Sequence, residues 1–305
     1  MWTKENIQSQ KGKIVIITGA NTGLGYEDAL ALYEKGAHII VAARNAEKAQ
    51  QAIDKIKTNG GDGNIEAATL DLANLKSVKE FADNFKKQHN QLDILINNAG
   101  VMMCPQSKTD DGFEMQFGVN FIGHFALTGY LYPLLRNTPN SRVVTLSSGS
   151  HRWVDYIDFD NLKLEKPYDP NREYATSKLA DLVFAIELQK RITTAGDDII
   201  SVAAHPGLTK TDLQRHLAGA DEKMSNYPVF MQPWQGALPT LYAATSSEVK
   251  GGSYYGPDGE KELSGYPSLA KISDAAMNET LAKKIWEYAE ESTGITYPEN
   301  QKIKS

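Results

Sequence analysis

The segment Lys13-Ile-Val-Ile-Ile-Thr18-Gly-Ala-Asn-Thr-Gly-Leu-Gly25 places a continuous apolar run directly before a turn with glycines at positions 19, 23 and 25. An apolar run of this kind predicts a strand that is buried on both faces of a parallel sheet. Glycine in the turn permits tight geometry and lets backbone amides approach a pyrophosphate at the positive end of the next helix. The segment therefore predicts a strand–turn–helix unit that binds a dinucleotide.

The glycine spacing is Gly-x-x-x-Gly-x-Gly, which differs from the more general Gly-x-Gly-x-x-Gly pattern. Because a strand precedes the turn and a helix from about 22 to 35 follows it, we interpret the glycines as a phosphate cradle. The alternative is a turn that needs glycine only for its backbone angles. The residues of this turn that we expect at the cofactor are Gly19, Asn21, Thr22, Gly23, Leu24 and Gly25.

Short β-branched runs alternate with helical segments along the rest of the chain, without repeats or low-complexity linkers. This alternation predicts a single α/β domain over residues 1–305, a Rossmann-type doubly wound parallel sheet flanked by helices. Further strands are expected at 38–43, 65–70, 92–96, 142–146 and 199–204. Helices are expected at 46–57, 75–88, 111–136 and 172–194, with a last helix around Ile285 that Gly294 could close.

Composition narrows the class of protein. The 305 residues are 41% hydrophobic and 23% charged, which is typical of a folded domain. A formal charge of −6 disfavours a nucleic-acid or anionic-membrane surface. The single cysteine, Cys104, fits a reducing compartment, and no apolar run is long enough for a signal sequence or membrane span. We therefore expect a cytoplasmic protein with no nucleic-acid partner and no membrane span.

The end of the second strand bears on the choice of nicotinamide cofactor. A carboxylate there selects the ribose hydroxyl of NAD, whereas an arginine accommodates the phosphate of NADP. The strand ends Ala42-Ala43-Arg44-Asn45, with no acidic residue. Arg44 could bind a phosphate through two hydrogen bonds of its guanidinium group, or it could be an ordinary solvated loop residue. We predict NADP(H) as the preferred cofactor, with NAD(H) as the alternative.

Tyr174-Ala-Thr-Ser-Lys178 places a phenol and an ammonium on one face of a predicted helix. A nearby ammonium favours the phenolate, so such a phenol could serve as a general acid or base. In isolation the pair could equally be a surface aromatic and a solvated charge. Because the glycine turn and the Ser147-Ser148 hydroxyls stand upstream, we interpret it as a proton-transfer site.

At this point residues 11–255 resemble the short-chain dehydrogenase/reductase family, within it the retinol dehydrogenase-like branch. The resemblance rests on seven motifs in order: Thr18 to Gly25, Asp71-Leu72, Asn97-Asn-Ala-Gly100, Val119-Asn120, Ser147-Ser148, Tyr174-x-x-x-Lys178 and Pro206-Gly-Leu-Thr-Lys-Thr211. Two features depart from the branch. Thr22 stands where many NADP-dependent relatives carry a basic residue, and the apolar N-terminal segment of the membrane-anchored enzymes is missing, so retinol itself is not implied.

The resemblance implies a role for each matching residue. Tyr174 would exchange the proton, Lys178 would lower the tyrosine pKa and bind the nicotinamide ribose, and Ser148 would bind the substrate oxygen. Asn120 would support a water between Lys178 and solvent. Asp71 and Leu72 would lie at the adenine. The remaining cofactor contacts would be Asn97, Asn98, Ala99 and Gly100 on the adenosine and ribose side, and Pro206, Gly207 and Thr211 at the nicotinamide.

Three histidines and a loop stay outside these roles. His151, Asp155, Asp158 and Asp160 lack a recognised ligand spacing, so we expect a solvated loop and no metal site. His205 is expected to pack near the cofactor. His124 could face the core or a subunit interface.

The segment 207–232 is expected to cover the substrate. Its Met224, Tyr227, Phe230 and Met231, with Trp234 beyond, could line an apolar pocket or pack on the last helices. We predict an oxidoreductase acting on a small, lipophilic alcohol or carbonyl compound. An NADP(H)-binding redox sensor or scaffold is the alternative, and a nucleotide-sugar epimerase or dehydratase is disfavoured by the glycine spacing. Relatives form dimers or tetramers, so a homo-oligomer is expected.

Overall fold

The first predicted strand is β1 (Ile14–Thr18), which lies between β2 (His38–Ala43) and β4 (Ile94–Asn97) in the middle of the sheet. A computed structural model of the chain describes residues 1–216 and 230–298. The side chains of Val15, Ile16 and Ile17 are completely buried. Since successive residues of a strand point to opposite faces, this burial means that both faces of β1 are covered, as the apolar run predicts.

Eight strands of the described chain form one sheet in the order β3-β2-β1-β4-β5-β6-β7-β8. The other strands are β3 (Asn64–Thr69), β5 (Ser141–Leu146), β6 (Ile199–Ala204), β7 (Tyr254–Pro257) and β8 (Pro267–Leu269). The six predicted strands are confirmed. The predicted doubly wound parallel sheet is confirmed for seven of these strands, and β8 pairs with β7 in the antiparallel direction. This exception is a three-residue strand at the sheet edge, joined to β7 by a short connection.

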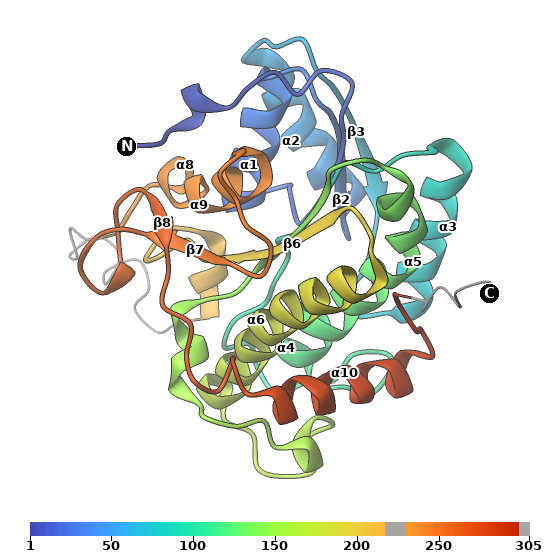
Figure 1. Cartoon of the computed structure of the whole chain (residues 1–305), viewed down its shortest axis with the longest axis vertical. Coiled ribbons are helices and arrows are strands. Elements are labelled where there is room, and N and C mark those ends of the chain that lie inside the picture. The colour runs from blue at the N-terminus through green and yellow to red at the C-terminus, as the bar shows by residue number, and fades with distance from the viewer. Residues whose placement is uncertain (217–229, 299–305) are drawn as a thin grey trace.

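Helices cover both faces of the sheet (Figure 1). One face carries α1 (Gly23–Glu34), α2 (Ala46–Thr58), α8 (Pro233–Gly236) and α9 (Leu238–Thr245). The other carries α3 (Leu75–Gln88), α4 (Met115–Phe117), α5 (Gly123–Asn137), α6 (Pro170–Ala195) and α10 (Glu279–Thr293). Shorter helical turns are η1 (Lys4–Asn6), the π-helix η2 (Gly118–Ile122), η3 (Gly149–Trp153), η4 (Phe159–Asn161), η5 (Asp212–His216) and η6 (Glu260–Glu262). The arrangement confirms the doubly wound Rossmann fold.

Local sequence signals explain where several helices begin and end. The side chains of Asn45, Asn74 and Asn278 each accept a hydrogen bond from a first-turn backbone amide of α2, α3 and α10. Such caps satisfy amides that have no partner within the helix. Gly196 and Gly294 follow α6 and α10 with φ of 73° and 69°, a left-handed geometry that glycine adopts without strain. Gly294 therefore closes the last helix as predicted.

The helix predicted at 111–136 begins later and is not uniform. Its first turn starts at Met115, because the Glu114 carboxylate accepts hydrogen bonds from the amides of Gln116 and Phe117. A π-helical turn, η2, then separates α4 from α5. Such a turn cannot be predicted from apolar periodicity, because it inserts residues into an otherwise continuous helical pattern.

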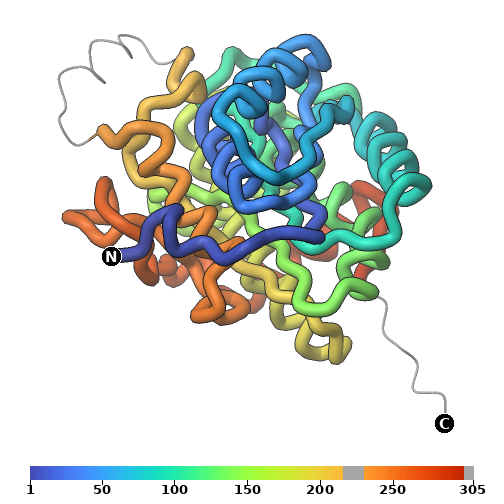
Figure 2. Tube along the Cα trace, turned by 90° about the horizontal axis from the view of Figure 1, so that it is seen from above, coloured from blue at the N-terminus to red at the C-terminus, as the bar shows by residue number. Residues whose placement is uncertain are grey.

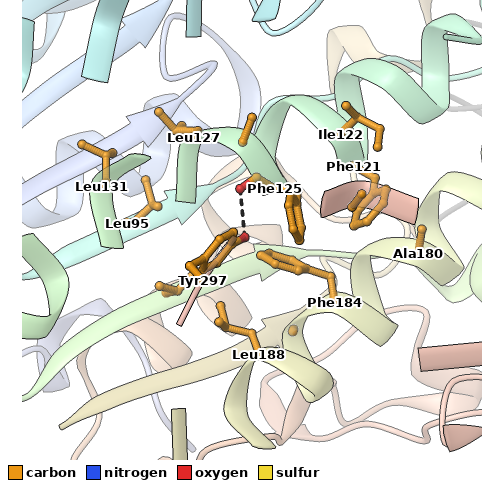
Figure 3. Packing of buried hydrophobic residues seen from close by; sticks show 14 of the residues in the cluster. Leu95, Phe121, Ile122, Phe125, Leu127, Leu131, Ala180, Phe184, Leu188 and Tyr297 are labelled. Atoms are coloured by element: carbon orange, nitrogen blue, oxygen red, sulfur yellow. Dashed lines mark hydrogen bonds between the residues drawn. The ribbon is translucent and has the colours of Figure 1, made fainter. Parts of the chain in front are cut away.

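Aromatic rings fill the core between α5, α6 and α10 (Figure 3). Phe125 packs against Phe184 and Trp286, with ring centroids 5.8 and 5.1 Å apart. Tyr297, beyond α10, inserts beside Phe125 and donates a hydrogen bond from its hydroxyl to the Phe125 carbonyl at 2.8 Å. The segment after α10 thus completes this layer.

The ends of the segment predicted to cover the substrate are joined to each other. The Met231 amide donates to the Leu208 carbonyl at 2.8 Å, and the Lys210 amide donates to the Met231 carbonyl at 3.0 Å. Met231 is buried and its sulfur contacts the Gly265 amide, so this side chain packs within the structure instead of lining a pocket. Trp234 is 49% exposed. Met224 and Tyr227 lie outside the described residues.

In Figure 2 the N-terminal segment, drawn in blue, passes in front of orange segments from the C-terminal part of the chain. The Trp2 ring meets the Tyr242 ring of α9 edge-on, with centroids 5.3 Å apart. Among the described residues, no helix combines the length and apolar character that crossing a bilayer requires.

Asp28 on α1 supplies a stability prediction. Its side chain is completely buried and neither carboxylate oxygen has a hydrogen-bond partner among the described residues, so burial raises its pKa well above the ordinary value. The folded state keeps a proton that the unfolded state releases above about pH 4, so the free energy of unfolding falls as pH rises. We expect the free energy of unfolding of Asp28→Asn, relative to that of wild type, to increase as the pH is raised above about pH 4, measured by urea unfolding.

Asp54→Asn, at an exposed position on α2, is the matched control and should change the free energy of unfolding little. A pH-independent difference for Asp28→Asn would contradict a proton held at this site.

Candidate active site

A cleft of about 990 Å³ opens at the carboxyl ends of β1, β2 and β4. Chain order reverses between β1 and β4, and such switch points are where open α/β sheets bind ligands. Many residues predicted at the cofactor line this cleft: Gly19, Asn21, Thr22, Gly23, Leu24, Arg44, Asp71, Leu72, Asn98, Ala99, Gly100 and Thr211.

The glycine turn fits a pyrophosphate on structural grounds. Gly19 and Gly23 have φ of 69° and 58°, a geometry that disfavours side chains. A Cβ at Gly25 would lie 2.5 Å from the Asn98 side-chain nitrogen, so only glycine leaves room for that amide. The first turn of α1 carries no acidic side chain. The backbone amides at this helix end are therefore available to an anion.

Cationic side chains gather at the part of the cleft formed by α2 and the end of β2. Arg44 is joined by Lys48 and Lys55, which with Gln51 follow each other at spacings of three and four along α2. Lys48 and Lys55 were not among the residues predicted at the cofactor. Their spacing could have predicted this position, because residues three and four apart lie on one face of a helix, and this helix begins directly after the Asn45 cap.

Six residues predicted at the cofactor do not line the cleft: Tyr174 and Lys178, which lie deeper on α6, and Gly25, Asn97, Pro206 and Gly207. Gly25 lies behind it, against Asn98. The side chain of Asn97 is buried and donates to Thr128 at 3.1 Å. Pro206 and Gly207 form the turn after β6, where a Cβ on Gly207 would lie 2.5 Å from the Leu263 carbonyl. Both residues pack at the edge of the sheet, and the chain after β6 first reaches the cleft at Thr211, followed by Asp212, Leu213 and Arg215.

Tyr174 and Lys178 lie on the buried face of α6, a helix that begins at the Asp169 cap and Pro170. They are 4% and 5% exposed, and Lys178 Nζ is 6.0 Å from the centroid of the Tyr174 ring. Burial raises the pKa of Tyr174, while the Lys178 ammonium and the Ser148 hydroxyl act in the opposite direction. The lysine thus has the predicted influence, although burial outweighs it in this structure.

Lys178 is anchored on two sides. Its Nζ donates to the Leu146 carbonyl at the end of β5 at 2.9 Å and to the Asp181 carboxylate at 2.8 Å. An ammonium has three donors, so one stays available. A Cβ on Gly100 would lie 3.9 Å from Nζ, so the lysine reaches the edge of the cleft lining.

The two serines after β5 have different surroundings. The Ser147 hydroxyl is buried and donates to the Lys178 carbonyl at 2.7 Å, which ties β5 to α6. Ser148 is half-buried and caps η3, with its hydroxyl 3.1 Å from the Ser150 hydroxyl. Because only the Ser148 hydroxyl is partly open to solvent and acts on Tyr174, it is the better candidate for a substrate contact.

His151 corrects the expectation of a solvated loop. It is completely buried, and its Nδ1 lies 2.7 Å from the Ser148 carbonyl, which identifies Nδ1 as the protonated nitrogen. Asp155 and Asp160 are exposed. Within residues 1–216 and 230–298, no cluster of three or more His, Cys, Asp or Glu side chains could hold a metal ion.

His205 also differs from the expectation. It packs against the Tyr254 ring, and its Nε2 lies 3.3 Å from Glu262, whose carboxylate also binds Arg152. The histidine therefore joins the β7 edge to the η3 turn, away from the cleft lining.

Asn120 lies in the π-helical turn η2, and its side chain is fully engaged. Its Oδ1 accepts from the Val101 amide at 2.8 Å, and its Nδ2 donates to the Val101 carbonyl and to Ser177. Its backbone carbonyl accepts from His124 Nδ1 at 2.7 Å. Asn120 thus fixes the loop beside Lys178, and the water relay stays a prediction from the family resemblance.

His124 faces the core, which decides between the two alternatives open from the sequence. It is 2% exposed, and its Nε2 lies 2.8 Å from the Thr18 hydroxyl. That hydroxyl also accepts from the amides of Asn98 and Ala99, both at 2.9 Å. Burial lowers the pKa of His124 to about 4, so the imidazole is neutral. A chain of hydrogen bonds therefore joins the π-helical turn η2, through His124 and Thr18, to the backbone of Asn98 and Ala99, which line the cleft.

This chain predicts the effect of His124→Leu. The change leaves the Asn120 carbonyl and the Thr18 hydroxyl without their buried partner, so we expect a loss of about 1–3 kcal/mol in the free energy of unfolding. In wild type the unfolded state binds a proton at His124 that the folded state lacks, so stability should fall between about pH 6.5 and about pH 4. Urea unfolding at several pH values measures both effects.

His38→Leu, on a partly exposed imidazole at the start of β2, is the control and should change stability much less. Equal losses for both variants would contradict the structural role of His124.

Known proteins resemble this chain over nearly its whole length. Residues 13–159 match the family model described as short chain dehydrogenase. Mouse retinol dehydrogenase 14 is 38% identical over 301 residues, covering 93% of this chain and 86% of that protein. Human polyprenol dehydrogenase is 36% identical over 290 residues, with coverage of 93% and 86%. The crystal structure of an uncharacterized protein from Mycobacterium Paratuberculosis is 36% identical, has a TM-score of 0.80 and covers 97% of this chain and 99% of that chain.

Proposed function

The chain belongs to the short-chain dehydrogenase/reductase family, and on that basis we propose that it transfers a hydride between NADP(H) and a lipophilic alcohol or carbonyl compound, with Tyr174 as the acid–base group. Membership makes it an oxidoreductase related to the retinol dehydrogenases. The cofactor preference, the substrate class and the residue roles are parts of the proposal.

One observation carries the proposal: a buried phenol–ammonium pair lies beside an anion-binding cleft at the carboxyl edge of the sheet. A redox sensor or scaffold would need the cleft but not the pair. Burying an ammonium and a phenol side by side costs free energy, so a role in proton transfer is the reason to maintain them.

In this proposal each side chain has a separate task. A bound nicotinamide supplies or accepts the hydride. Ser148 donates a hydrogen bond to the substrate oxygen, and Tyr174 gives that oxygen its proton during reduction or removes it during oxidation. Lys178 stabilises the tyrosinate and offers its free donor to the cofactor ribose. Asn120 holds the Val101 backbone beside this group.

The basic residues of the cleft support NADP(H) over NAD(H). Arg44, Lys48 and Lys55 together form a site for a dianionic phosphate, whereas the end of β2 offers no carboxylate to a ribose hydroxyl. These lysines offset the absence of a basic residue at Thr22. The family as a whole uses both cofactors.

The lipophilic substrate is inferred from the named relatives, which include retinol and polyprenol dehydrogenases. A cytoplasmic location and a homo-oligomer, dimer or tetramer, stay predictions from the sequence.

One helix face is already covered within the chain, because Trp286 of α10 packs against Phe184 and Arg191 of α6. An assembly through helix faces would therefore have to use other surfaces.

The proposal predicts NADPH-dependent reduction of lipophilic aldehydes or ketones, followed by NADPH absorbance, and all-trans-retinal is included among the test compounds because retinol dehydrogenases are relatives of the chain. Tyr174→Phe removes the transferable proton but keeps the ring, so we expect kcat to fall by about 10²–10⁴-fold while NADPH affinity stays near the wild-type value. Isothermal titration with NADPH measures the binding.

Tyr156→Phe is the matched control, because Tyr156 is 70% exposed on the loop after η3, and it should leave kcat unchanged. Turnover of small polar sugars alone would contradict the substrate class. Binding of NADPH without turnover of any compound would favour the redox-sensing or scaffold alternative.

Arg44→Ala tests the cofactor preference. Removing a charge-assisted contact to the phosphate should weaken NADPH binding about tenfold or more and leave NADH binding nearly unchanged. Lys57→Ala, on α2 but outside the cleft lining, is the control. Equal loss of affinity for both cofactors would rule out Arg44 as the phosphate contact.

A further inference from the structure

A buried carboxylate contacts the lysine of the proposed proton-transfer site. Asp181 follows Lys178 by three residues on α6, and its Oδ2 lies 2.8 Å from Lys178 Nζ. Asp181 is 1% exposed, and its Oδ1 has no hydrogen-bond partner among the described residues. Asp181 is not among the residues predicted from the sequence to form the site.

Stability alone does not explain this ion pair. Removing two charges from water costs free energy that their attraction regains only when the remaining polar atoms are also satisfied, and Oδ1 is not. The carboxylate does, however, fix one of the three ammonium donors, while Leu146 fixes a second. The lysine is thereby held in one position between β5 and α6.

We propose that Asp181 is a positioning residue that anchors the Lys178 ammonium and offsets part of the positive charge that Tyr174 experiences. This inference rests on the proposed function of the Tyr174–Lys178 pair. It assigns to the site a third charged group, which opposes the effect of the lysine on the phenol.

The electrostatic directions agree with this role. Burial alone lowers the pKa of Lys178, but the Asp181 charge reverses that effect and raises it, so the lysine stays charged. For Tyr174, burial raises the pKa, Lys178 lowers it and Asp181 raises it further. Asp181 therefore secures the charge of Lys178 and at the same time limits how strongly this charge acidifies the phenol.

Other titratable groups around the pair carry no charge near neutral pH. His124 approaches Lys178 from α5, and burial lowers its pKa to about 4. Tyr254 approaches Tyr174 from β7, and burial raises its pKa. The Ser148 hydroxyl acts on Tyr174 from the end of β5. A change in charge at position 181 should therefore be felt directly by Tyr174.

Asp181→Asn removes the negative charge at nearly constant shape, and an amide oxygen still accepts from Lys178. Since Leu146 keeps its hydrogen bond to the ammonium, we expect the lysine to stay charged and its full charge to act on Tyr174. The phenol should then ionise about one pH unit lower, as expected for a unit charge several ångströms away in a protein interior.

Ultraviolet difference titration of the tyrosinate band tests this without turnover. The wild type is compared with Tyr174→Phe, and Asp181→Asn with the double variant, so that each difference reports Tyr174 alone. A lower Tyr174 pKa in Asp181→Asn supports the proposal, and an unchanged or higher value overturns it. Because no substrate is present, the result is independent of whether the proposed reaction occurs.

A second readout is the pH profile of all-trans-retinol oxidation with NADP⁺. For Asp181→Asn the rising limb of the kcat–pH profile should move to lower pH by as much as the Tyr174 pKa falls. A purely structural role would lower kcat at every pH without moving this limb. Asp181→Glu restores the charge and should return the limb toward wild type. Glu187→Gln, which removes a charge from the same helix where it pairs with Arg191, should not move it.

Asp181→Ser removes the charge and leaves room for a water beside Lys178, so it is titrated in the same way if Asp181→Asn does not fold. Failure of both variants to fold would assign Asp181 to stability and overturn the proposal.

Discussion

The Thr18 hydroxyl joins the parts of this structure on which the site depends. Thr18 is the last residue of β1. Its hydroxyl accepts hydrogen bonds from the amides of Asn98 and Ala99, which follow β4, and it contacts His124 on α5. One hydroxyl has two lone pairs and one proton, so these three contacts use its whole capacity. The glycine turn, the wall of the cleft and the π-helical turn therefore keep a fixed relation to one another.

The proposed proton-transfer site balances burial against charge. Burial disfavours the charged forms of Tyr174 and Lys178, and the structure compensates with fixed partners in place of water. These partners come from two elements. Leu146 at the end of β5 and Asp181 on α6 both accept hydrogen bonds from Lys178, and the Ser147 hydroxyl donates from the end of β5 to the Lys178 carbonyl on α6. The ionisation of the phenol is thus set by residues that also hold the sheet to its longest helix.

Periodicity in the sequence predicted the elements with strong local signals. Of the strands up to β6, β1, β2 and β4 are nearly continuous apolar runs and the others contain short apolar or β-branched runs, while α2, α3 and α10 have N-terminal caps. β7 was missed because Tyr254-Tyr-Gly-Pro257 is short and contains residues that strands usually avoid. The late start of α4 was missed because it depends on the Glu114 carboxylate, and a buried glutamate resembles a surface residue in the sequence.

By itself the sequence determined the fold, the glycine turn and the family, because these depend on residue type at fixed spacing along one strand or helix. It also placed Tyr174 and Lys178 on one helix face. Only the tertiary structure decided that His151 and His124 are buried, that Asn97 points away from the cleft, and that Asp181 reaches Lys178 within the core. These outcomes depend on which side of an element meets another element far away in the chain. Burial arises from that packing and no local pattern encodes it, whereas the three-residue spacing by itself places Asp181 beside Lys178 on α6.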